Sequence, residues 1–196
     1  SVTFFTSDRH HAGMATHHAR GLRVVYVDGD EIVAAEGSFE HRIALAQIPL
    51  TRNGTIGFQV ENAMAAIAAG WALGLDWKII HSGLASFVSD AATVPGRFNL
   101  FDYRGATLIA DYGHNPDAIQ ALVKAIEHMP AKRRMVVISG AGDRRNEDIR
   151  QQTQILGEAF DAVILYQDQC QRGRADGEVL ALLQQGPVQL QHELHM

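Results

Sequence analysis

The sequence predicts an α/β fold in two parts, a β-hairpin with helices followed by a parallel sheet with helices. Two apolar segments flank Asp28-Gly29-Asp30, and an Asp-Gly turn between apolar runs is a strong hairpin signal. Apolar residues recur at helical spacing between residues 61 and 89. From residue 106 on, strand-like and helix-like segments alternate, which implies parallel strands joined by right-handed helical connections.

The first part is expected to hold a small sheet and two helices. Pro49 closes the last strand-like run of this part, and Gly74 is a stop signal for the first helix. The expected strands cover 2–6, 23–27, 31–35 and 41–50, and the expected helices cover 61–75 and 77–89.

The second part follows the clearest turn signal of the chain, Pro95-Gly96. We therefore place a domain boundary there, with one domain over 1–94 and the other over 95–196. Three strands make a small sheet, so we expect the second domain to be incomplete, with Gln-rich residues 184–196 as a tail. The expected strands cover 106–111, 134–139 and 162–166, and the expected helices cover 116–128, 147–160 and 177–184.

Composition limits the classes of function. The apolar content of 46% supports a packed core, and the net charge of −5 argues against a nucleic-acid surface, which is normally basic. No apolar run is long enough for a membrane helix. Cys170 is the only cysteine, which excludes an internal disulfide and fits a reducing cytoplasm. The chain opens in a strand-like run without an initiator Met, so we expect it to be a piece of a longer protein.

The histidines do not predict a metal site. The pairs His10-His11 and His17-His18 are seven residues apart, which on a helix is about 10 Å of rise and too far to share one ion. His192-Glu193-Leu194-His195 is one residue short of the zinc-protease pattern H-E-x-x-H. We therefore predict no metal ligands in this chain.

The turn after the strand at 106–111 is the first candidate site. Asn115 and the two residues after it are explained by helix capping alone. Asp111 and His114 are not. Asp111 is expected to end a buried strand, where a carboxylate needs a partner, and His114 lies beside it on the turn. Either the two side chains form a ligand-facing pair or a local hydrogen bond satisfies them.

The turn after the next strand reads G-A-G-D-R-R, from Gly140 to Arg145. Gly140 and Gly142 would let backbone amides approach a ligand, and the start of the following helix favours anions. Two arginines, Arg144 and Arg145, can bind carboxylate or phosphate. The alternative is a pair of solvated arginines at a helix start.

Four further residues are candidates, each with a plain structural alternative. Arg97 follows the Pro-Gly turn and could swing onto a phosphate, or it is a surface arginine. Asn62, expected at the start of a helix, is either a cap or a contact to a base or sugar. Arg172 and Arg174 lie in a charged loop with Asp168 and Glu178 nearby, which is either a solvated loop or a site for a substrate carboxylate or guanidinium.

Several of these segments together resemble the Mur ligases and folylpolyglutamate synthetases, and within them the cyanophycin synthetase family. The resemblance covers nearly the whole chain. The combination of A-G-D-R-R with R-G-R-x-D-G-E points to the cyanophycin branch. The segments concerned are Q-V-E-N-A-M-A-A-I-A-A-G-W-A-L-G-L, V-P-G-R-F-N, D-Y-G-H-N-P, A-G-D-R-R-N-E-D-I and L-Y-Q-D-Q-C-Q-R-G-R-A-D-G-E-V.

The resemblance implies an ATP-dependent ligase that joins arginine to the β-carboxylates of an aspartate polymer through an acyl phosphate. The chain would be the end of a central ATPase domain followed by a Rossmann-like C-terminal domain. The implied cofactors are ATP and Mg²⁺, with the Mg²⁺ ligands mainly in upstream segments, and the implied assembly is a homo-oligomer.

The resemblance also implies roles for the candidate residues. Asn62 and Gln59 lie where adenine is contacted, and Arg97 matches a hinge arginine that approaches ATP. Asp111 and His114 match the motif that faces the nucleotide. The substrate residues would be Asp143, Arg144, Arg145, Arg172 and Arg174, and Pro95-Gly96 would be the hinge of a closing site.

One departure from the family pattern is clear, because the sequence contains no G-x-x-x-x-G-K-[ST] phosphate loop. We therefore expect this chain alone to be inactive. Two other functions stay open, a Mur-type ligase acting on a peptidoglycan or folate substrate and a non-catalytic module that binds nucleotide or polymer.

Overall fold

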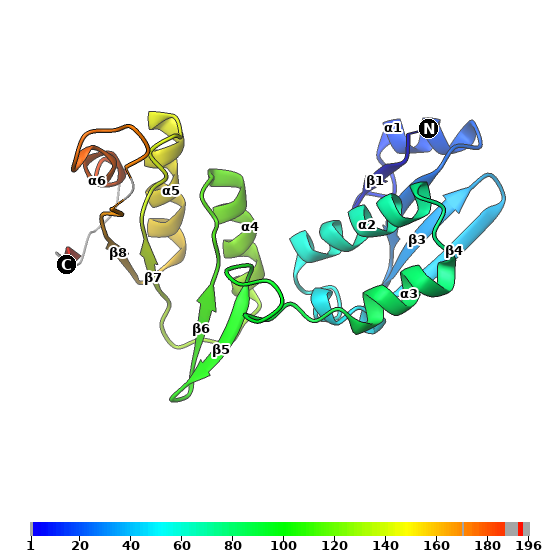
Figure 1. The fold of residues 1–196 in the computed structure, drawn as a ribbon, viewed down its shortest axis with the longest axis horizontal. Coiled ribbons are helices and arrows are strands. Elements are labelled where there is room, and N and C mark those ends of the chain that lie inside the picture. Colours follow the sequence, from blue (N-terminus) through cyan, green and yellow to red (C-terminus); the bar gives the residue numbers. More distant parts are fainter. Residues whose placement is uncertain (1, 170, 187–191, 194–196) are drawn as a thin grey trace. The chain divides into compact units, whose positions relative to one another are not determined.

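The computed structural model describes residues 2–169, 171–186 and 192–193, and the chain forms two compact units (Figure 1). The first unit runs to Asp111 and the second starts at Tyr112. This boundary therefore lies later in the sequence than the Pro95-Gly96 turn, where the sequence placed it. The helices and strands of the first unit are β1 (Phe4–Thr6), α1 (Ala12–Ala19), β2 (Val24–Asp28), β3 (Glu31–Glu36), β4 (Phe39–Ala44), α2 (Gly57–Ala72), α3 (Trp77–Ser86), β5 (Asn99–Tyr103) and β6 (Ala106–Ala110). Those of the second unit are α4 (Pro116–Glu127), β7 (Met135–Ile138), α5 (Asn146–Ala159), β8 (Ala162–Leu165), α6 (Glu178–Leu183) and β9 (His192–Glu193).

A four-stranded sheet in the order β1-β2-β3-β4 organises the first unit. The predicted hairpin is confirmed: β2 and β3 pair antiparallel, with Asp28 opposite Glu31 across the turn. One sheet face, with Ile32 and Ile43, packs in a core cluster with residues of α2 and α3. On the other face Met14 of α1 covers Val33 and its neighbours. Helices thus protect both faces of the sheet.

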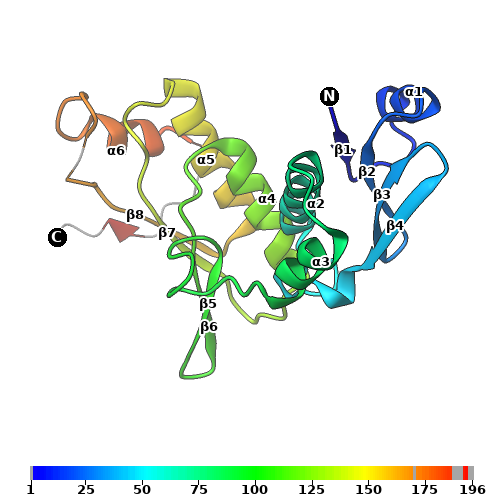
Figure 2. The same cartoon turned by 45° about the vertical axis from the view of Figure 1, so that its right-hand side comes forward.

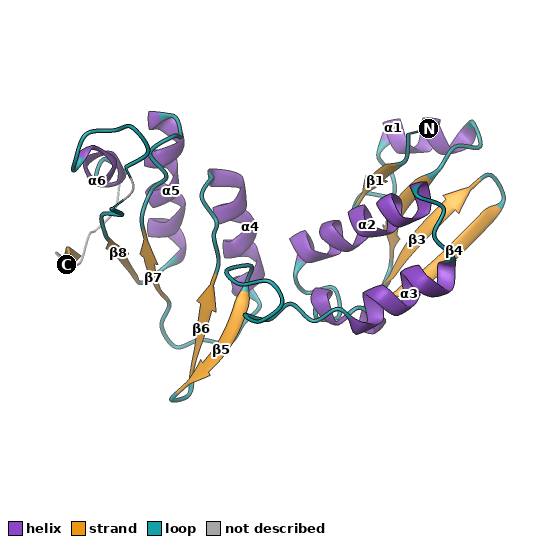
Figure 3. Ribbon diagram, viewed as in Figure 1, coloured by secondary structure: helices purple, strands orange, loops and turns teal. Residues whose placement is uncertain are grey.

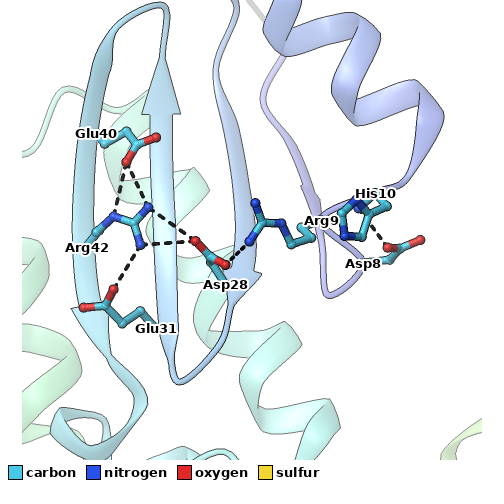
Figure 4. Close-up of polar contacts among 7 residues, drawn as sticks. All are labelled: Asp8, Arg9, His10, Asp28, Glu31, Glu40 and Arg42. Atoms are coloured by element: carbon cyan, nitrogen blue, oxygen red, sulfur yellow. Dashed lines mark hydrogen bonds and ion pairs between the residues drawn. The ribbon is translucent and has the colours of Figure 1, made fainter.

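An ion-pair network lies on the same sheet face as Val33, since Val33 is paired with Arg42 across β3 and β4. Figure 4 shows the Arg42 guanidinium contacting Glu31, Glu40 and Asp28, and Arg9 reaching Asp28 from the loop before α1. Hydrogen bonds to Glu31 and Glu40 raise the pKa of Arg42. Every charge in this network is partnered, so it stabilises the sheet locally and offers no free group.

The helix predicted over 61–75 begins earlier, at Gly57. Gln59 and Val60 are buried, and burying them against the core extends the helix toward its N-terminus beyond the periodic run. Gly74 has a φ of +77° just after the helix, as its role as a stop signal requires. The Asp76 side chain caps α3 by accepting from the amide of Lys78. Figure 2 shows α2 and α3 close to each other in this unit, and Gly70 of α2 abuts Ile80 of α3.

One local prediction for the first unit was wrong, and two elements were missed. The strand expected over 41–50 is β4, which ends at Ala44 and is followed by two short 3-10 turns, Leu45–Gln47 and Pro49–Thr51. Helix α1 was missed because it buries only Met14 and carries little apolar periodicity. Strand β5 was also missed. It forms an antiparallel hairpin with β6 through a turn in which Arg104 and Gly105 both have positive φ (Figure 3).

The second unit has the predicted parallel sheet, but with different strands. Its order is β7-β8-β9, all parallel, with β6 paired to β5 instead. The segment expected as a tail therefore supplies the third strand, since His192 and Glu193 pair with β8. The core of this unit joins both helix and strand residues. Its largest fully buried members are Ile149, Leu156, Leu165 and Leu183.

No helix of the described residues has both the length and the apolar character that crossing a membrane requires.

Candidate functional site

A buried and an exposed amide side chain form a pair on α2. Asn62 Nδ2 donates to Gln59 Oε1 at 3.0 Å, and Gln59 is 6% exposed while Asn62 is exposed. Because α2 begins at Gly57, Asn62 lies in its second turn and is not the cap that its expected position suggested. The buried Gln59 thus fixes the orientation of an exposed carboxamide whose Oδ1 is left to accept a hydrogen bond.

The V-P-G-R-F-N segment is a hydrogen-bonded loop within the first unit. Gly96, at a φ of +72°, donates its amide to Asn99 Oδ1 at 2.7 Å, and Asn99 Nδ2 donates to the carbonyl of Val94 at 3.1 Å. Asn99 is 1% exposed. A buried amide side chain therefore braces the turn that the sequence suggested as a hinge. Sequence reasoning missed Asn99; its signal was a polar residue at the end of the Pro-Gly motif.

Asp111 holds the next residue of the same loop. Its Oδ2 accepts from the amide of Phe98 at 2.8 Å, and Phe98 has a φ of +52° with its ring packed edge-on against Phe58. The premise that Asp111 ends a buried strand is wrong, because β6 is mostly exposed and so is Asp111. The carboxylate nevertheless has a backbone partner, which is the local hydrogen bond left open above.

Arg97 lies between these fixed points with a free side chain. It is exposed, and its guanidinium makes no hydrogen bond or ion pair with any described residue. Its carbonyl accepts from Ser89 Oγ at 3.2 Å. The loop thus fixes the backbone of Arg97 and leaves a cation available for an anionic ligand.

His114 lies on the first turn of the second unit. Its Nδ1 is 2.9 Å from the carbonyl oxygen of Tyr112, which can only accept, so Nδ1 carries a proton, and a neutral ring with this contact has Nε2 as its acceptor nitrogen. The rings of Tyr112 and His114 are 5.3 Å apart. Gln152, fully buried on α5, donates to the His114 carbonyl at 3.1 Å. Tyr112 and Gln152 were both missed from the sequence.

The capping interpretation of the same turn is confirmed. Asn115 Oδ1 accepts from the amide of Ala118 at 2.8 Å, Pro116 begins α4, and Asp117 lies in its first turn. Asp111 and His114 each have a hydrogen-bond partner within their own unit, and whether the two side chains face one ligand stays a prediction.

The glycines of G-A-G-D-R-R are required by packing within the second unit, because a side chain at either position would clash with neighbouring residues. A Cβ on Gly142 would lie 2.1 Å from the carbonyl oxygen of Gln171, and one on Gly140 would lie 2.7 Å from Val179. The expectation that these glycines make room for a ligand is corrected: they make room for the loop before α6 and for α6. The turn is consequently packed against the R-G-R segment.

Arg174 clamps this turn. Its guanidinium donates to the carbonyls of Gly142 and Arg144, both at 2.6 Å, and pairs with Glu178 at 2.6 Å. The side chain is 17% exposed. The hydrogen bond from Arg174 lowers the pKa of Glu178. All three guanidinium nitrogens are engaged within the chain, so the geometry favours a bracing role for Arg174 over direct contact with a substrate.

Arg172 joins two turns. Its NH1 lies 3.1 and 3.2 Å from the two oxygens of Asp143, and its NH2 donates to the Tyr112 hydroxyl at 2.6 Å. Partial desolvation raises the pKa of Asp143, but the hydrogen bonds and charge of Arg172 outweigh it, and the net pKa is lowered. Asp143 is therefore an ionised carboxylate whose charge is already balanced by Arg172.

The two arginines that follow Asp143 differ. Arg145 bonds Asp148 through two nitrogens, at 2.7 and 3.0 Å, at the start of α5. The Nε of Arg144 is buried and has no partner among the described atoms, while its carbonyl is held by Arg174. Of the five residues predicted to bind substrate, the second unit thus brings Asp143, Arg172 and Arg174 into one bonded group with the Arg144 backbone.

Comparison with known proteins agrees with this architecture. Residues 96–195 match the model of the Mur ligase glutamate ligase domain. A cyanophycin synthetase of Synechocystis is 34% identical over 96% of this chain and 22% of its own length, and one of Trichormus variabilis is 32% identical over 97% and 21%. The chain spans about a fifth of the length of these relatives.

The solved structures show the same fold. A folylpolyglutamate synthase of Thermotoga maritima superposes with a TM-score of 0.57 at 19% identity, covering 97% of this chain and 46% of that one. E. coli FolC, solved with DHPP and ADP, gives 0.58 at 20%, covering 99% and 44%. The prediction of an α/β fold with a parallel sheet is confirmed.

Proposed function

Because half of this chain matches a Mur ligase domain, it belongs to the Mur ligase family, and we propose that it is part of an ATP-dependent ligase that joins arginine to the β-carboxylates of an aspartate polymer. The family relation supports a ligase. The identity of the substrate and the roles of single residues are our proposal.

One observation carries the choice of substrate. The two motifs that resemble the cyanophycin branch, A-G-D-R-R and R-G-R, are far apart in sequence but directly bonded in the second unit through Arg172 to Asp143 and through Arg174 to Gly142. Because each motif holds the other in place, we expect the two to contribute to the same binding site. The cyanophycin synthetases are also the relatives that align over nearly the whole chain.

We propose that the first unit contributes nucleotide contacts. Asn62, oriented by Gln59, has the exposed donors and acceptor that a base or ribose requires, and Arg97 is a free cation suited to a phosphate. Asp111 fixes the loop that presents Arg97 and leaves its Oδ1 for a ligand. ATP, when bound, supplies the phosphoryl group that activates the carboxylate to be joined.

We propose that the second unit contributes His114 to the nucleotide contacts and the Asp143-Arg144-Arg145 turn to the amino-acid contacts. The buried Nε of Arg144 has no partner among the described residues, which supports a role for this side chain in binding rather than in holding the turn. Among the described residues no three His, Cys, Asp or Glu side chains gather as a metal site. Independently of that absence, we propose that the residues that hold Mg²⁺ lie mainly in upstream segments, and no role here is derived through it.

The chain alone is proposed to be inactive, because phosphoryl transfer depends on a phosphate cradle that the sequence does not contain. Groups that bind the base, sugar and amino acid position substrates but do not hold the transferred phosphoryl group. We propose that activity, and a homo-oligomeric assembly, belong to a longer polypeptide.

The test is arginine-dependent ADP release with an aspartate–arginine polymer primer, measured on the longer polypeptide and on this chain in parallel. Release by the former and none by the latter would support the proposal. Release that depends instead on a peptidoglycan peptide or on glutamate with a folate would assign another Mur-type ligase. Binding of nucleotide without turnover of any of these substrates would assign a non-catalytic module.

A further inference from the structure

Three turns of the second unit meet at one guanidinium. Arg172, in the left-handed region with a φ of +48°, reaches the carboxylate of Asp143 and the hydroxyl of Tyr112. Tyr112 follows β6, Asp143 follows β7, and Arg172 follows β8. Turns after parallel strands such as β7 and β8 are where α/β proteins place ligand-binding residues. The Arg172 side chain therefore links two such turns to Tyr112.

Tyr112 transmits this constraint to His114. Its hydroxyl accepts from Arg172 at 2.6 Å, its ring packs on the His114 ring at 5.3 Å, and its carbonyl accepts a hydrogen bond from His114 Nδ1 at 2.9 Å. From the other side Gln152 donates to the His114 carbonyl. These contacts favour the Nδ1–H tautomer of the neutral His114 ring.

We propose that Tyr112 and Arg172 are positioning residues: Arg172 links Tyr112 to Asp143, and Tyr112 holds His114 through its Nδ1–H, which leaves Nε2 as the ring nitrogen without a partner among the described residues. This inference rests on the proposed ligase function for its catalytic consequence, but its structural content does not. Arg172 is therefore assigned to an internal link rather than to substrate binding, since Asp143 and Tyr112 occupy its guanidinium. We call the set of contacts from Asp143 through Arg172 and Tyr112 to His114 the latch.

The kinetic test separates positioning from folding. Tyr112→Phe keeps the ring beside His114 and removes only the hydroxyl, and Arg172→Lys keeps the charge but cannot bond both partners. We expect each to lower kcat for arginine-dependent ADP release by about tenfold with an unchanged melting temperature. The double variant should be no worse than Arg172→Lys alone, because both changes break the same link.

Two matched controls come from the same chain. Tyr103 is an exposed tyrosine at 55%, close to the 53% of Tyr112. The Arg150 side chain is 39% exposed, against 37% for Arg172, and its nearest acid is Glu147 at 4.0 Å. Tyr103→Phe and Arg150→Lys should leave kcat unchanged. Unchanged kcat in Tyr112→Phe, or losses that multiply in the double variant, would overturn the latch.

A second readout does not need activity. In a long-range ¹H–¹⁵N spectrum of this 196-residue chain, His114 should show the Nδ1–H tautomer, and Arg172→Lys should populate the Nε2–H form. An Nε2–H tautomer in the unchanged chain would contradict the latch. Absence of arginine-dependent ADP release in the unchanged longer polypeptide would instead contradict the proposed function, and the spectrum would still decide the latch.

Discussion

The loop at 94–99 and the turn at 140–145 both carry arginine in a glycine-containing motif, but they are held in opposite ways. In the first, Asn99 and Asp111 hold the backbone and the Arg97 side chain is left without a partner among the described residues. The second is held by arginines of the R-G-R segment, Arg172 on Asp143 and Arg174 on the turn carbonyls. An arginine in a motif is therefore a candidate ligand only once its internal partners are known.

The largest expected effect on stability comes from adding a methyl group to the turn at 140–145. Gly142→Ala places a Cβ 2.1 Å from the Gln171 carbonyl oxygen, which is backbone and cannot move aside cheaply. We expect a loss of about 3 kcal/mol or more in the free energy of unfolding of the second unit, because two backbone segments must separate. Calorimetry of the chain measures it.

The control for that variant is Gly83→Ala in α3, where an added Cβ meets nothing within 4 Å. It should leave stability unchanged or raise it by up to about 1 kcal/mol, since alanine is the better helix former. A Gly142→Ala protein as stable as Gly83→Ala would show that the turn does not pack against the R-G-R segment.

A smaller effect is expected in the first region. Asn99→Ala removes the acceptor of the Gly96 amide and the donor to the Val94 carbonyl, and should cost about 1–3 kcal/mol. Trp71 and Trp77 are the only tryptophans and both lie in the first unit, so their fluorescence during urea unfolding reports this unit. Asn146→Ala, an exposed position in the second unit, should not shift that transition.

The smallest effect concerns pH. Hydrogen bonds from Arg145 and Arg174 lower the folded-state pKa values of Asp148 and Glu178. Since the unfolded carboxyls titrate near pH 4, this stabilisation is complete above about pH 4 and is lost as pH falls through the lower folded values. The melting temperature of the second unit should therefore drop on acidification below about pH 4. Glu178→Gln should make that drop smaller, and an unaltered drop would contradict the assigned pair.

The hairpin, α4 and the alternating order of the second unit were predictable because hydrophobic period and capping residues act locally. Asn115, for example, caps its helix as its type and position indicate. The pairing of β6 with β5 was not predictable in this way, since the Arg104-Gly105 turn lacks the usual Asn-Gly or Asp-Gly signal.

In the candidate site, residue types were predictable and partners were not. The motifs indicated Arg172, Arg174 and Asp143, but whether an arginine meets a substrate or a neighbouring carbonyl depends on long-range packing. Tyr112 and Gln152 were missed because their roles come from contacts 60 and 38 residues away in sequence. The glycines were assigned to a ligand because sequence gives no view of the backbone of Gln171.

The contrast between the two regions is tested most directly by comparing Arg97→Ala with Arg174→Ala in the same chain. The measurement is amide hydrogen exchange of buried residues in each unit, which gives the free energy of opening of each separately. Arg97→Ala should change that of the first unit by no more than about 0.5 kcal/mol, because its side chain is free. Arg174→Ala should lower that of the second by about 2–4 kcal/mol, since two carbonyls lose their donor. Equal losses, or an Arg174→Ala protein as stable as the original, would contradict the account.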